Sequence, residues 1–447
     1  MQDISNDNHH VMTYMTLHDI DADIVVAGGG LAGCLAAIGC KRTNPTARVF
    51  LIERYGFLGG MATSGYVFPY MRYSTRLSSG ERKRLVGGLF QEMNDRLVKE
   101  EYMQDAKNPF PARFDPAMMR CVLDEMLLDA GVDLLFHGMI NHVDTAVDKE
   151  SAINVQYATI QTKAGSITAS ARYFIDATGD ADLVFHAGGE WVMGREADGL
   201  VQPGTLNFRM GNISSIAESR GMIGIKIRKE KLAGNLLTPR DNCLAFDAGH
   251  HQLHFNQTRV HGFDFTDPFD MTKAEIEGRA QARRFITFLR NKVMGYRHST
   301  VVGLGTQLGI RETRRIVGEY VLTEQDLLDC IEFPDRIALG NYNIDIHDPK
   351  GTASTEIKRI PEGKWYGIPF RSLIPKRIDN MLVAGRPIST THVAHSAIRV
   401  LPICSAIGHA AGVAAGLALK ASQPIPFKNM LVVEIQQVLR SQGAVLE

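Results

Sequence analysis

The sequence predicts an α/β fold in which parallel strands alternate with helices, and three observations lead to this prediction. Residues 23–27 form an apolar strand that runs into a glycine turn and an alanine-rich helix. A second apolar strand, residues 49–53, follows at the spacing of a β-α-β unit. A third apolar strand ends at Asp176. Strands that alternate with helical stretches are typical of a parallel sheet covered by helices.

The glycine turn of the first unit indicates a dinucleotide site. Gly28 permits the tight turn, Gly30 lets the backbone approach a pyrophosphate, and Gly33 lets the helix pack close to the sheet. The helix directs its free N–H groups and the positive end of its dipole toward the phosphates. Glu53, at the end of the second strand, has the spacing of an acid that accepts hydrogen bonds from a ribose diol. We therefore predict a Rossmann-like domain with a bound dinucleotide.

The remaining elements follow from hydrophobic spacing and from capping residues. Asp115 followed by Pro116 predicts a helix start, and Thr272 with Glu275 three residues later predicts another through a capping box. Lys163-Ala-Gly165 predicts a turn between strands. The other expected elements are a helix over 85–98, strands over 132–136, 153–175, 299–304 and 380–384, and a long helix from Pro402.

The domain organisation is expected to be discontinuous. Residues 1–20 are polar and predict a flexible tail. Nucleotide-binding segments stand near both ends of the chain, so we assign 21–193 and 366–447 to the cofactor domain and 194–365 to an inserted substrate or cap domain. This layout is uncommon in simple NAD dehydrogenases and usual in flavoproteins.

Five segments carry a resemblance to a known family: residues 27–34, 53–60, 176–182 and 309–318, and, near the C-terminus, 382–386 with 399–402 and 408–412. On these segments the chain resembles the FAD-dependent oxidoreductase family related to the fumarate reductase and succinate dehydrogenase flavoproteins. The resemblance implies FAD as the cofactor. It also implies a Rossmann-like FAD-binding domain, made of a parallel sheet plus a β-meander, with an inserted α+β substrate domain.

The contacts expected with FAD extend beyond the first glycine turn. Small residues after Gly59 present backbone N–H groups where a loop lies against the diphosphate and the flavin edge. The helix from Pro402 is expected to point free N–H groups at the flavin pyrimidine. An ordinary turn near Gly179 and a solvated surface role for Arg386 remain open alternatives. The further cofactor candidates are Leu31, Ala32, Arg54, Gly59, Gly60, Met61, Ala62, Thr63, Met139, Ala177, Gly179, Asp180, Gly385, Arg386, Leu401, Ile403 and Cys404.

The candidates for catalysis are histidines and arginines, because hydride transfer needs a proton carrier and an anionic substrate needs arginine. His392 and Arg399 rank first, since they lie just before the flavin-facing helix, and His347 and Arg371 follow. Arg311, Arg314 and Arg315 form a cluster for which a salt bridge with Glu312 or Glu319 is as plausible as substrate binding. No metal site is predicted, since His250 and His254 lack further ligands. The glycines of 303–309 lack the spacing of a second nucleotide site.

Composition excludes several classes of protein. Lys plus Arg and Asp plus Glu both number 49, so no net field attracts nucleic acid. The polar N-terminus is not a signal peptide, and the apolar run 401–419 carries Ser405 and His409, which favours a buried helix over a membrane span. We expect a cytoplasmic protein with a small-molecule substrate and with no nucleic-acid or membrane partner. A homo-oligomer is left open.

The function predicted is an FAD-dependent oxidoreductase that transfers a hydride between flavin N5 and a carbon of a small organic substrate. A flavin monooxygenase or oxidase is one alternative, and a non-catalytic or partner-dependent flavoprotein subunit is another. The electron acceptor is left open among oxygen, a quinone and a partner protein.

Overall fold

A central sheet organises the fold in the computed structural model, which describes residues 19–104, 110, 112–149, 151–351 and 355–447. Four strands pair in parallel in the order β7 (Asp133–Phe136), β2 (Val49–Glu53), β1 (Ile20–Ala27), β10 (Gly165–Asp176). The end of β10 also pairs in parallel with β21 (Met381–Val383), so the C-terminal segment returns to the same sheet. The carboxyl ends of β1, β2, β10 and β21 therefore meet at one edge, where open α/β sheets bind ligands.

A β-meander continues the sheet beyond its parallel part. β8 (Met139–Val147), β9 (Ile153–Thr162) and the first half of β10 pair antiparallel, and the turn at Lys163 joins the last two. Because β10 is long, its first half belongs to the meander and its second half to the parallel sheet. The parallel sheet plus β-meander that the resemblance implied is confirmed.

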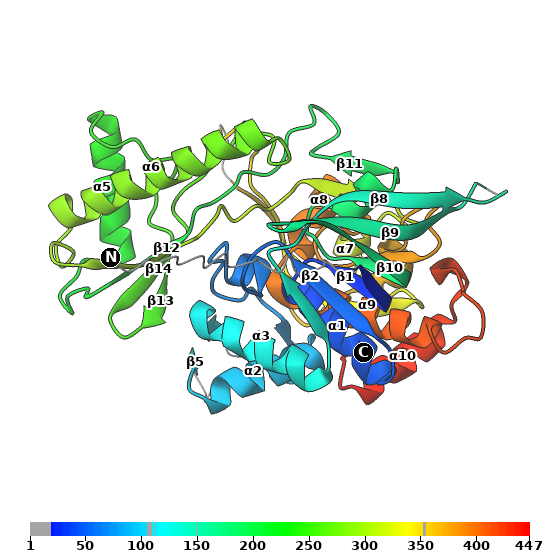
Figure 1. Ribbon diagram of the computed structural model, residues 1–447. Helices are drawn as coiled ribbons and strands as arrows, with labels where there is room; N and C mark the ends of the chain where they lie inside the picture. Colours follow the sequence, from blue (N-terminus) through cyan, green and yellow to red (C-terminus); the bar gives the residue numbers. More distant parts are fainter. Residues whose placement is uncertain (1–18, 105–109, 111, 150, 352–354) are drawn as a thin grey trace, which may run out of the picture.

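Two helices cover one face of the parallel sheet and pack along each other (Figure 1). They are α1 (Leu31–Thr43) and α9 (Leu401–Ala418). Gly408 and Gly412 of α9 lie one turn apart, and a Cβ on either would overlap the backbone of α1 at Ala32 or Ala36. The small residues of α9 therefore serve close helix packing. By length and composition α9 is long and apolar enough to cross a membrane, but 78% of it is buried inside the protein.

Helices α2 (Leu89–Lys99) and α3 (Pro116–Ala130) flank α1. Asp115 caps α3 as predicted, since its carboxylate accepts the N–H groups of Ala117 and Met118. α10 (Val432–Ser441) packs against α9. The smaller elements are β3 (Ser74–Arg76), β4 (Arg82–Arg84), β5 (Met103–Gln104), β6 (Arg113–Phe114), α4 (Asp182–His186), β11 (Trp191–Met193), β16 (Arg314–Ile316), α7 (Glu324–Leu328), β17 (Arg336–Gly340), β18 (Ile344–Ile346), β19 (Glu356–Lys358), β20 (Tyr366–Pro369), α8 (His392–Ile398) and three short 3₁₀ turns (Gly60–Ala62, Phe370–Leu373 and Phe427–Asn429).

The inserted cap has its own sheet and core and lies to one side of the central sheet (Figure 1). Its strands run antiparallel in the order β13 (Ala245–Gly249), β14 (Gln252–Phe255), β12 (Phe208–Gly211), β15 (Thr300–Leu304). Helices α5 (Arg220–Leu232) and α6 (Pro268–Lys292) contribute apolar residues to the same core. Phe208 stacks on Phe255 within it, with ring centroids 4.9 Å apart.

Three expectations need correction or lie beyond the description. The cap core runs from Val201 to Ile310, whereas 316–374 pack into the main core, so the expected cap segment 194–365 is too long at its C-terminal end. The helix expected at Thr272 begins earlier, because Asp267 accepts the N–H groups of Phe269 and Asp270 and Pro268 takes the first helical position. The tail expected over 1–20 falls outside the described residues up to 18, and Ile20 already belongs to β1.

Candidate functional site

The first glycine turn has the geometry that its sequence predicts. Gly28 has φ +98°, and a Cβ there would lie 2.5 Å from Ala177 O, so only glycine fits. A Cβ on Gly33 would overlap Gly28 O, because the first turn of α1 lies directly against the end of β1. The first hydrogen bond of α1 runs from Cys34 N–H to Gly30 O, which leaves the preceding N–H groups of its first turn directed at the sheet edge.

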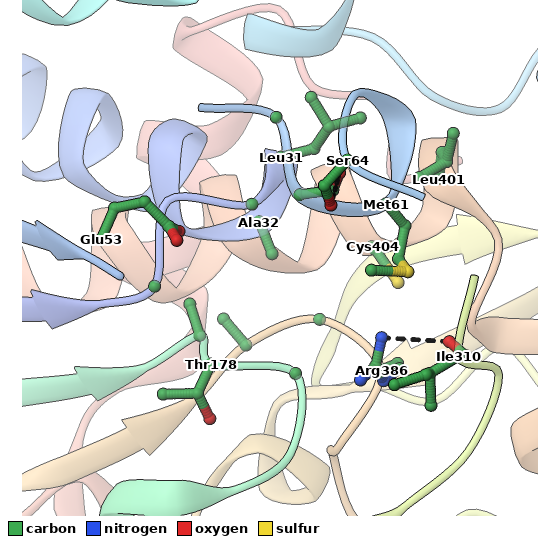
Figure 2. A pocket seen from close by; sticks show the side chains of 18 of the residues that line it. Leu31, Ala32, Glu53, Met61, Ser64, Thr178, Ile310, Arg386, Leu401 and Cys404 are labelled. Carbon is green, nitrogen blue, oxygen red and sulfur yellow. Dashed lines mark hydrogen bonds between the residues drawn. The ribbon is translucent and has the colours of Figure 1, made fainter. Parts of the chain in front are cut away.

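A second glycine loop lies against the first. Gly59 N–H donates to Gly29 O, and a Cβ on Gly60 would lie 2.8 Å from Gly30 Cα. Both loop glycines have positive φ. The loop carries Met61 and Ser64 to the same edge, and both glycine stretches line one space there (Figure 2).

The acid at the end of β2 is buried beside this backbone. Glu53 Oε2 accepts Gly29 N–H at 2.6 Å, and Oε1 accepts Tyr55 N–H at 2.9 Å. Burial raises the pKa of Glu53, and these N–H groups and Arg54 oppose the rise. Each carboxylate oxygen retains a lone pair, so Glu53 can still accept hydrogen bonds from a diol.

The returning C-terminal segment closes the other side of the space. Arg386 follows β21, and its guanidinium pairs with Asp180 Oδ1 at 2.6 Å and donates to Ile310 O at 3.2 Å (Figure 2). Burial would raise the pKa of Asp180, but Arg386 and Arg54 hold it below its ordinary value. Thr313 also donates to Asp180. Arg386 is therefore fixed in the site and is not a solvated surface charge.

Together these segments line a crevice along the carboxyl edge of the sheet. Its main part spans about 790 Å³, including space open to solvent, and a smaller part of about 440 Å³ shares Gly28, Glu53, Arg54 and Thr178 with it. A crevice in which glycine backbone and an acid lie where its two parts meet fits a dinucleotide, so the residues present fit FAD. We call the two parts together the cofactor crevice.

Most of the predicted cofactor residues line the cofactor crevice. They are Gly28, Gly30, Leu31, Ala32, Glu53, Arg54, Gly59, Gly60, Met61, Ala177, Gly179, Gly385, Arg386, Leu401 and Cys404, with Met139 in the smaller part. Others support the crevice from behind. Ala62 is fully buried and Thr63 donates to Leu58 O, so both point into the protein. Gly33 contacts the turn, Asp180 holds Arg386, and Ile403 is fully buried in α9.

The N-terminus of α9 needs one correction. Leu401 and Cys404 line the crevice, but Cys404 N–H donates to Val400 O as the first hydrogen bond of the helix. The expectation that the Cys404 N–H group is free to contact the flavin is therefore wrong. Leu401 and Ile403 precede that bond, so their N–H groups are the ones without a partner inside the helix.

A second cavity of about 730 Å³ adjoins the crevice and lies against the cap sheet. Five residues line both spaces: Met61, Ile310, Arg386, Arg399 and Leu401. One wall is apolar, from Val67, Pro69 and Met71, and the cap contributes Thr205, Asn207 and Asn256. We call this space the arginine cavity, because Arg311 and Arg399 both line it.

The arginine cavity carries an excess of buried positive charge. Arg311 is 8% exposed, and its Nη1 donates to Pro203 O and Thr205 Oγ1. Burial lowers its pKa well below the ordinary value, and the nearby charges of Arg399, Arg240 and Arg259 lower it further. The carboxylate that lines the cavity with them is Asp345. Such an arrangement favours an anionic ligand.

A tyrosine, an acid and a histidine form the polar wall of the arginine cavity. Tyr342 donates to Asp345 Oδ2 at 2.8 Å, and His347 Nε2 lies 3.6 Å from the same oxygen. Burial raises the pKa of Tyr342, so it stays protonated at neutral pH. His347 and Arg399 are thus the two predicted catalytic residues that the structure brings together.

The other two predicted catalytic residues lie elsewhere. Arg371 pairs with Asp335 at 2.8 Å, is 47% exposed at its side chain and does not line the cavity. His392 begins α8, and its Nδ1 lies 2.9 Å from Glu312 Oε1 in a buried cluster with Arg315. His392 lines neither the crevice nor the cavity.

The three arginines of segment 311–315 make different contacts. Arg311 lines the cavity, Arg314 pairs with Asp182 at 2.9 Å, and Arg315 pairs with the fully buried Glu312. For Arg315, the salt bridge with Glu312 that was left open is what the structure shows, whereas Arg314 pairs with Asp182 and with neither Glu312 nor Glu319. Arg311 alone among the three faces the ligand space.

Some residues that line the cofactor crevice were not predicted. One of them, Gln307, lies in the glycine-rich run 303–309, which stands out in the sequence. Tyr55, Gln307 and Ile310 line the crevice, and Tyr55 hydrogen-bonds Gln307 across it. The glycine-rich run 303–309 packs against the second glycine loop. Gln307 of this run donates a hydrogen bond to Ser64 Oγ of the loop. Gly305 permits this packing, since a Cβ there would lie 3.3 Å from Gly65 O.

His250 and His254 do not share a ligand space. His250 lies in a left-handed turn between β13 and β14, and His254 is buried against Tyr66 and Phe68. Burial lowers the pKa of His254 well below its ordinary value, with Arg209 adding to the effect. Within the described residues, no three His, Cys, Asp or Glu side chains gather as metal ligands would.

The sequence model of a family described as FAD dependent oxidoreductase matches residues 23–439. No curated protein sequence matches the chain significantly.

Among solved structures, a geranylgeranyl bacteriochlorophyll reductase-like protein (Ta0516) from Thermoplasma acidophilum has 12% identity and a TM-score of 0.45, covering 95% of this chain and 84% of that one. p-Nitrophenol 4-monooxygenase PnpA from Pseudomonas putida DLL-E4 has 11% identity and a TM-score of 0.43, covering 95% and 85%. A flavoprotein/dehydrogenase from Cytophaga hutchinsonii has 13% identity and a TM-score of 0.43, covering 93% and 83%. The family match and the chain's own residues, rather than these structures, support the conclusions that follow.

Proposed function

The chain belongs to the family of FAD-dependent oxidoreductases, and from that premise we propose that it transfers a hydride between FAD and a carbon atom of a small organic substrate that carries an anionic group. Family membership makes the protein an enzyme with FAD as its cofactor. Bound FAD supplies the atom that accepts or releases the hydride. The cofactor crevice would hold it through the backbone of both glycine loops, Glu53 and Arg386.

One observation carries the proposal: the arginine cavity opens into the cofactor crevice through shared residues, and besides Arg386, which is paired with Asp180, it is lined by the buried Arg311 and the half-buried Arg399. Arg311 and Arg399 would bind the anionic group and orient the substrate. Val67, Pro69 and Met71 would exclude water from the reacting carbon. The pair of Tyr342 and Asp345 would hold the proton that accompanies the hydride, with the proton between Tyr342 Oη and Asp345 Oδ2.

Several finer points belong to the same proposal. The segments around Arg311 and Arg399 support a relationship to fumarate reductase and succinate dehydrogenase flavoproteins. The electrons would leave to oxygen, a quinone or a partner protein. We also expect a cytoplasmic protein without a membrane or nucleic-acid partner: the burial of α9 opposes a membrane span, and the equal numbers of Lys plus Arg and Asp plus Glu give no net field for nucleic acid.

Anaerobic mixing of the FAD-bound protein with a panel of small molecules tests the proposal. We expect carboxylic acids to bleach the flavin absorbance and matched esters or amides to leave it unchanged. The Arg399→Met variant should lose this bleaching and keep reduction by dithionite, whereas Arg371→Met should behave as the wild type, because Arg371 lies outside the cavity. Bleaching by uncharged compounds alone would contradict the anionic substrate. Rapid peroxide release or substrate hydroxylation in air would identify an oxidase or monooxygenase instead.

A further inference from the structure

The contacts of His347 fix which of its ring nitrogens carries the proton. His347 Nδ1 lies 3.2 Å from Arg259 Nη2 and 3.1 Å from Thr355 Oγ1. A guanidinium has only N–H donors and no acceptor. Arg259 therefore donates to Nδ1, which must accept and so carries no proton. A neutral imidazole has one N–H group, and in His347 it is Nε2–H.

Thr355 is compatible with the same assignment. Its Oγ1 lies 2.6 Å from Arg259 Nη2, so it accepts a hydrogen bond from the guanidinium. Its own hydroxyl proton is then free to point at His347 Nδ1. Both neighbours of Nδ1 can therefore donate to it, and Arg259, which cannot accept, excludes a proton on that nitrogen.

The surroundings also oppose a second proton on the ring. Four arginines surround His347 from different segments: Arg259 after β14, Arg240 before β13, Arg311 before β16 and Arg399 at the end of α8. Asp345 of β18 faces Nε2 at 3.6 Å, while Asp348 lies 3.8 Å from Arg195. Burial lowers the pKa of His347 well below its ordinary value, and the four arginines lower it further.

We infer that Arg259 is a positioning residue that holds His347 as the neutral Nε2–H tautomer, so that His347 donates a hydrogen bond to an oxygen acceptor of the substrate. The substrate in this inference is that of the proposed function. His347 lines the arginine cavity, while Arg259 stands behind it. In this tautomer Nε2 cannot remove a proton from the substrate, because it already carries one. The substrate class narrows to anions that place a carbonyl or carboxylate oxygen beside Nε2.

The direct test is ¹⁵N NMR of the FAD-bound protein labelled at histidine, with the His347 signals assigned from the His347→Gln variant. We expect an unprotonated Nδ1 and a protonated Nε2, unchanged between about pH 5 and pH 8. In Arg259→Met, Nδ1 loses its donor, so the ring should populate the other tautomer or titrate within that range. Arg259→Lys retains a donor-only group and should restore the wild-type signals.

Arg240→Met is the matched control, because it removes a guanidinium from the same cluster that contacts Asn256 rather than His347. It should leave the His347 signals unchanged. A proton on Nδ1 in the wild type, titration of wild-type His347 near its ordinary pKa, or identical behaviour of Arg259→Met and Arg240→Met would overturn the inference. Because this readout needs no substrate, a confirmed tautomer together with a flavin that no acid reduces would reject the proposed function alone.

Discussion

The cofactor crevice and the arginine cavity share a wall but are built differently. The crevice is made largely of backbone, from two glycine loops and two helix N-termini that lie against each other. The cavity is made largely of side chains from seven separate stretches between Met61 and Leu401. A space built from backbone serves a ligand that every family member binds, whereas a space built from side chains can change with the substrate.

The two spaces also differ in charge. In the crevice Arg386 is matched by Asp180, and Glu53 is held by backbone N–H groups. In the cavity Arg311 and Arg399 face one carboxylate, and two further arginines lie behind them. The crevice is thus nearly balanced without its ligand, whereas the cavity depends on an anion to balance it. Variants in the cofactor crevice and in the arginine cavity test this difference.

The largest effect is expected where the backbone approach is closest. In Gly28→Ala the new Cβ would meet Ala177 O at 2.5 Å in a residue with φ +98°. We expect at least about 4 kcal/mol of destabilisation and purified protein without flavin colour. Gly188→Ala is the control, since Gly188 has φ +74° with open space around it, and it should cost about 1 kcal/mol and keep FAD. Thermal unfolding and the flavin spectrum measure both; equal losses would refute the close approach.

The next largest effect is the loss of folding stability in acid that the buried His409 of α9 should cause. His409 of α9 is buried with Nε2 2.8 Å from Gln442 Oε1, and burial lowers its pKa from 6.5 to about 4. Between these values the unfolded chain binds a proton that the folded protein does not, so the free energy of unfolding falls as the pH is lowered. The loss from this residue should approach about 3 kcal/mol near pH 4. Denaturant unfolding against pH should show a shallower slope in His409→Gln; an unchanged slope would assign the effect elsewhere.

An effect of similar size is expected on the affinity of the arginine cavity for an anion when Arg311 is replaced. Arg311→Met removes one of the two lining guanidiniums that are not paired with Asp180, and the affinity of the FAD-bound protein for sulfite, an anion that bleaches oxidised flavin, should fall about 100-fold. Arg371→Met removes an exposed guanidinium paired with Asp335 and should change it less than twofold. Titration at 450 nm, about the flavin absorbance maximum, measures both affinities. Equal affinities in the two variants would show that the cavity charge does not act on the flavin face.

The smallest effect is expected for Glu53, the acid that the sequence predicts to bind the ribose. Glu53→Gln keeps the size of the side chain but directs an NH₂ group at one of the two N–H donors it now accepts. FAD affinity should weaken about tenfold, with little change in sulfite affinity once FAD is bound. Fluorescence of released FAD on dilution gives the first quantity. A larger effect on sulfite than on FAD would place Glu53 in the wrong space.

The sequence was sufficient for the crevice because its parts are continuous in the chain. Gly28, Gly59 and Glu53 act through local backbone or strand-end geometry, and each lies where its neighbours in sequence predict. The same logic explains the errors. Cys404 N–H is the first bonded donor of α9, which depends on where the helix begins, and helix starts such as Pro268 are decided by competing caps.

The sequence by itself determined a Rossmann-like unit, its glycine contacts and a crevice lined from both ends of the chain, because these depend on spacing along single segments. Only the tertiary structure decided which charged side chains share a space. Arg311 and His347 enter the cavity while Arg371 and His392 do not, because each position depends on how the cap and the returning segment pack together. Buried charge is set by partners that lie far apart in the chain, and no local pattern encodes those partners.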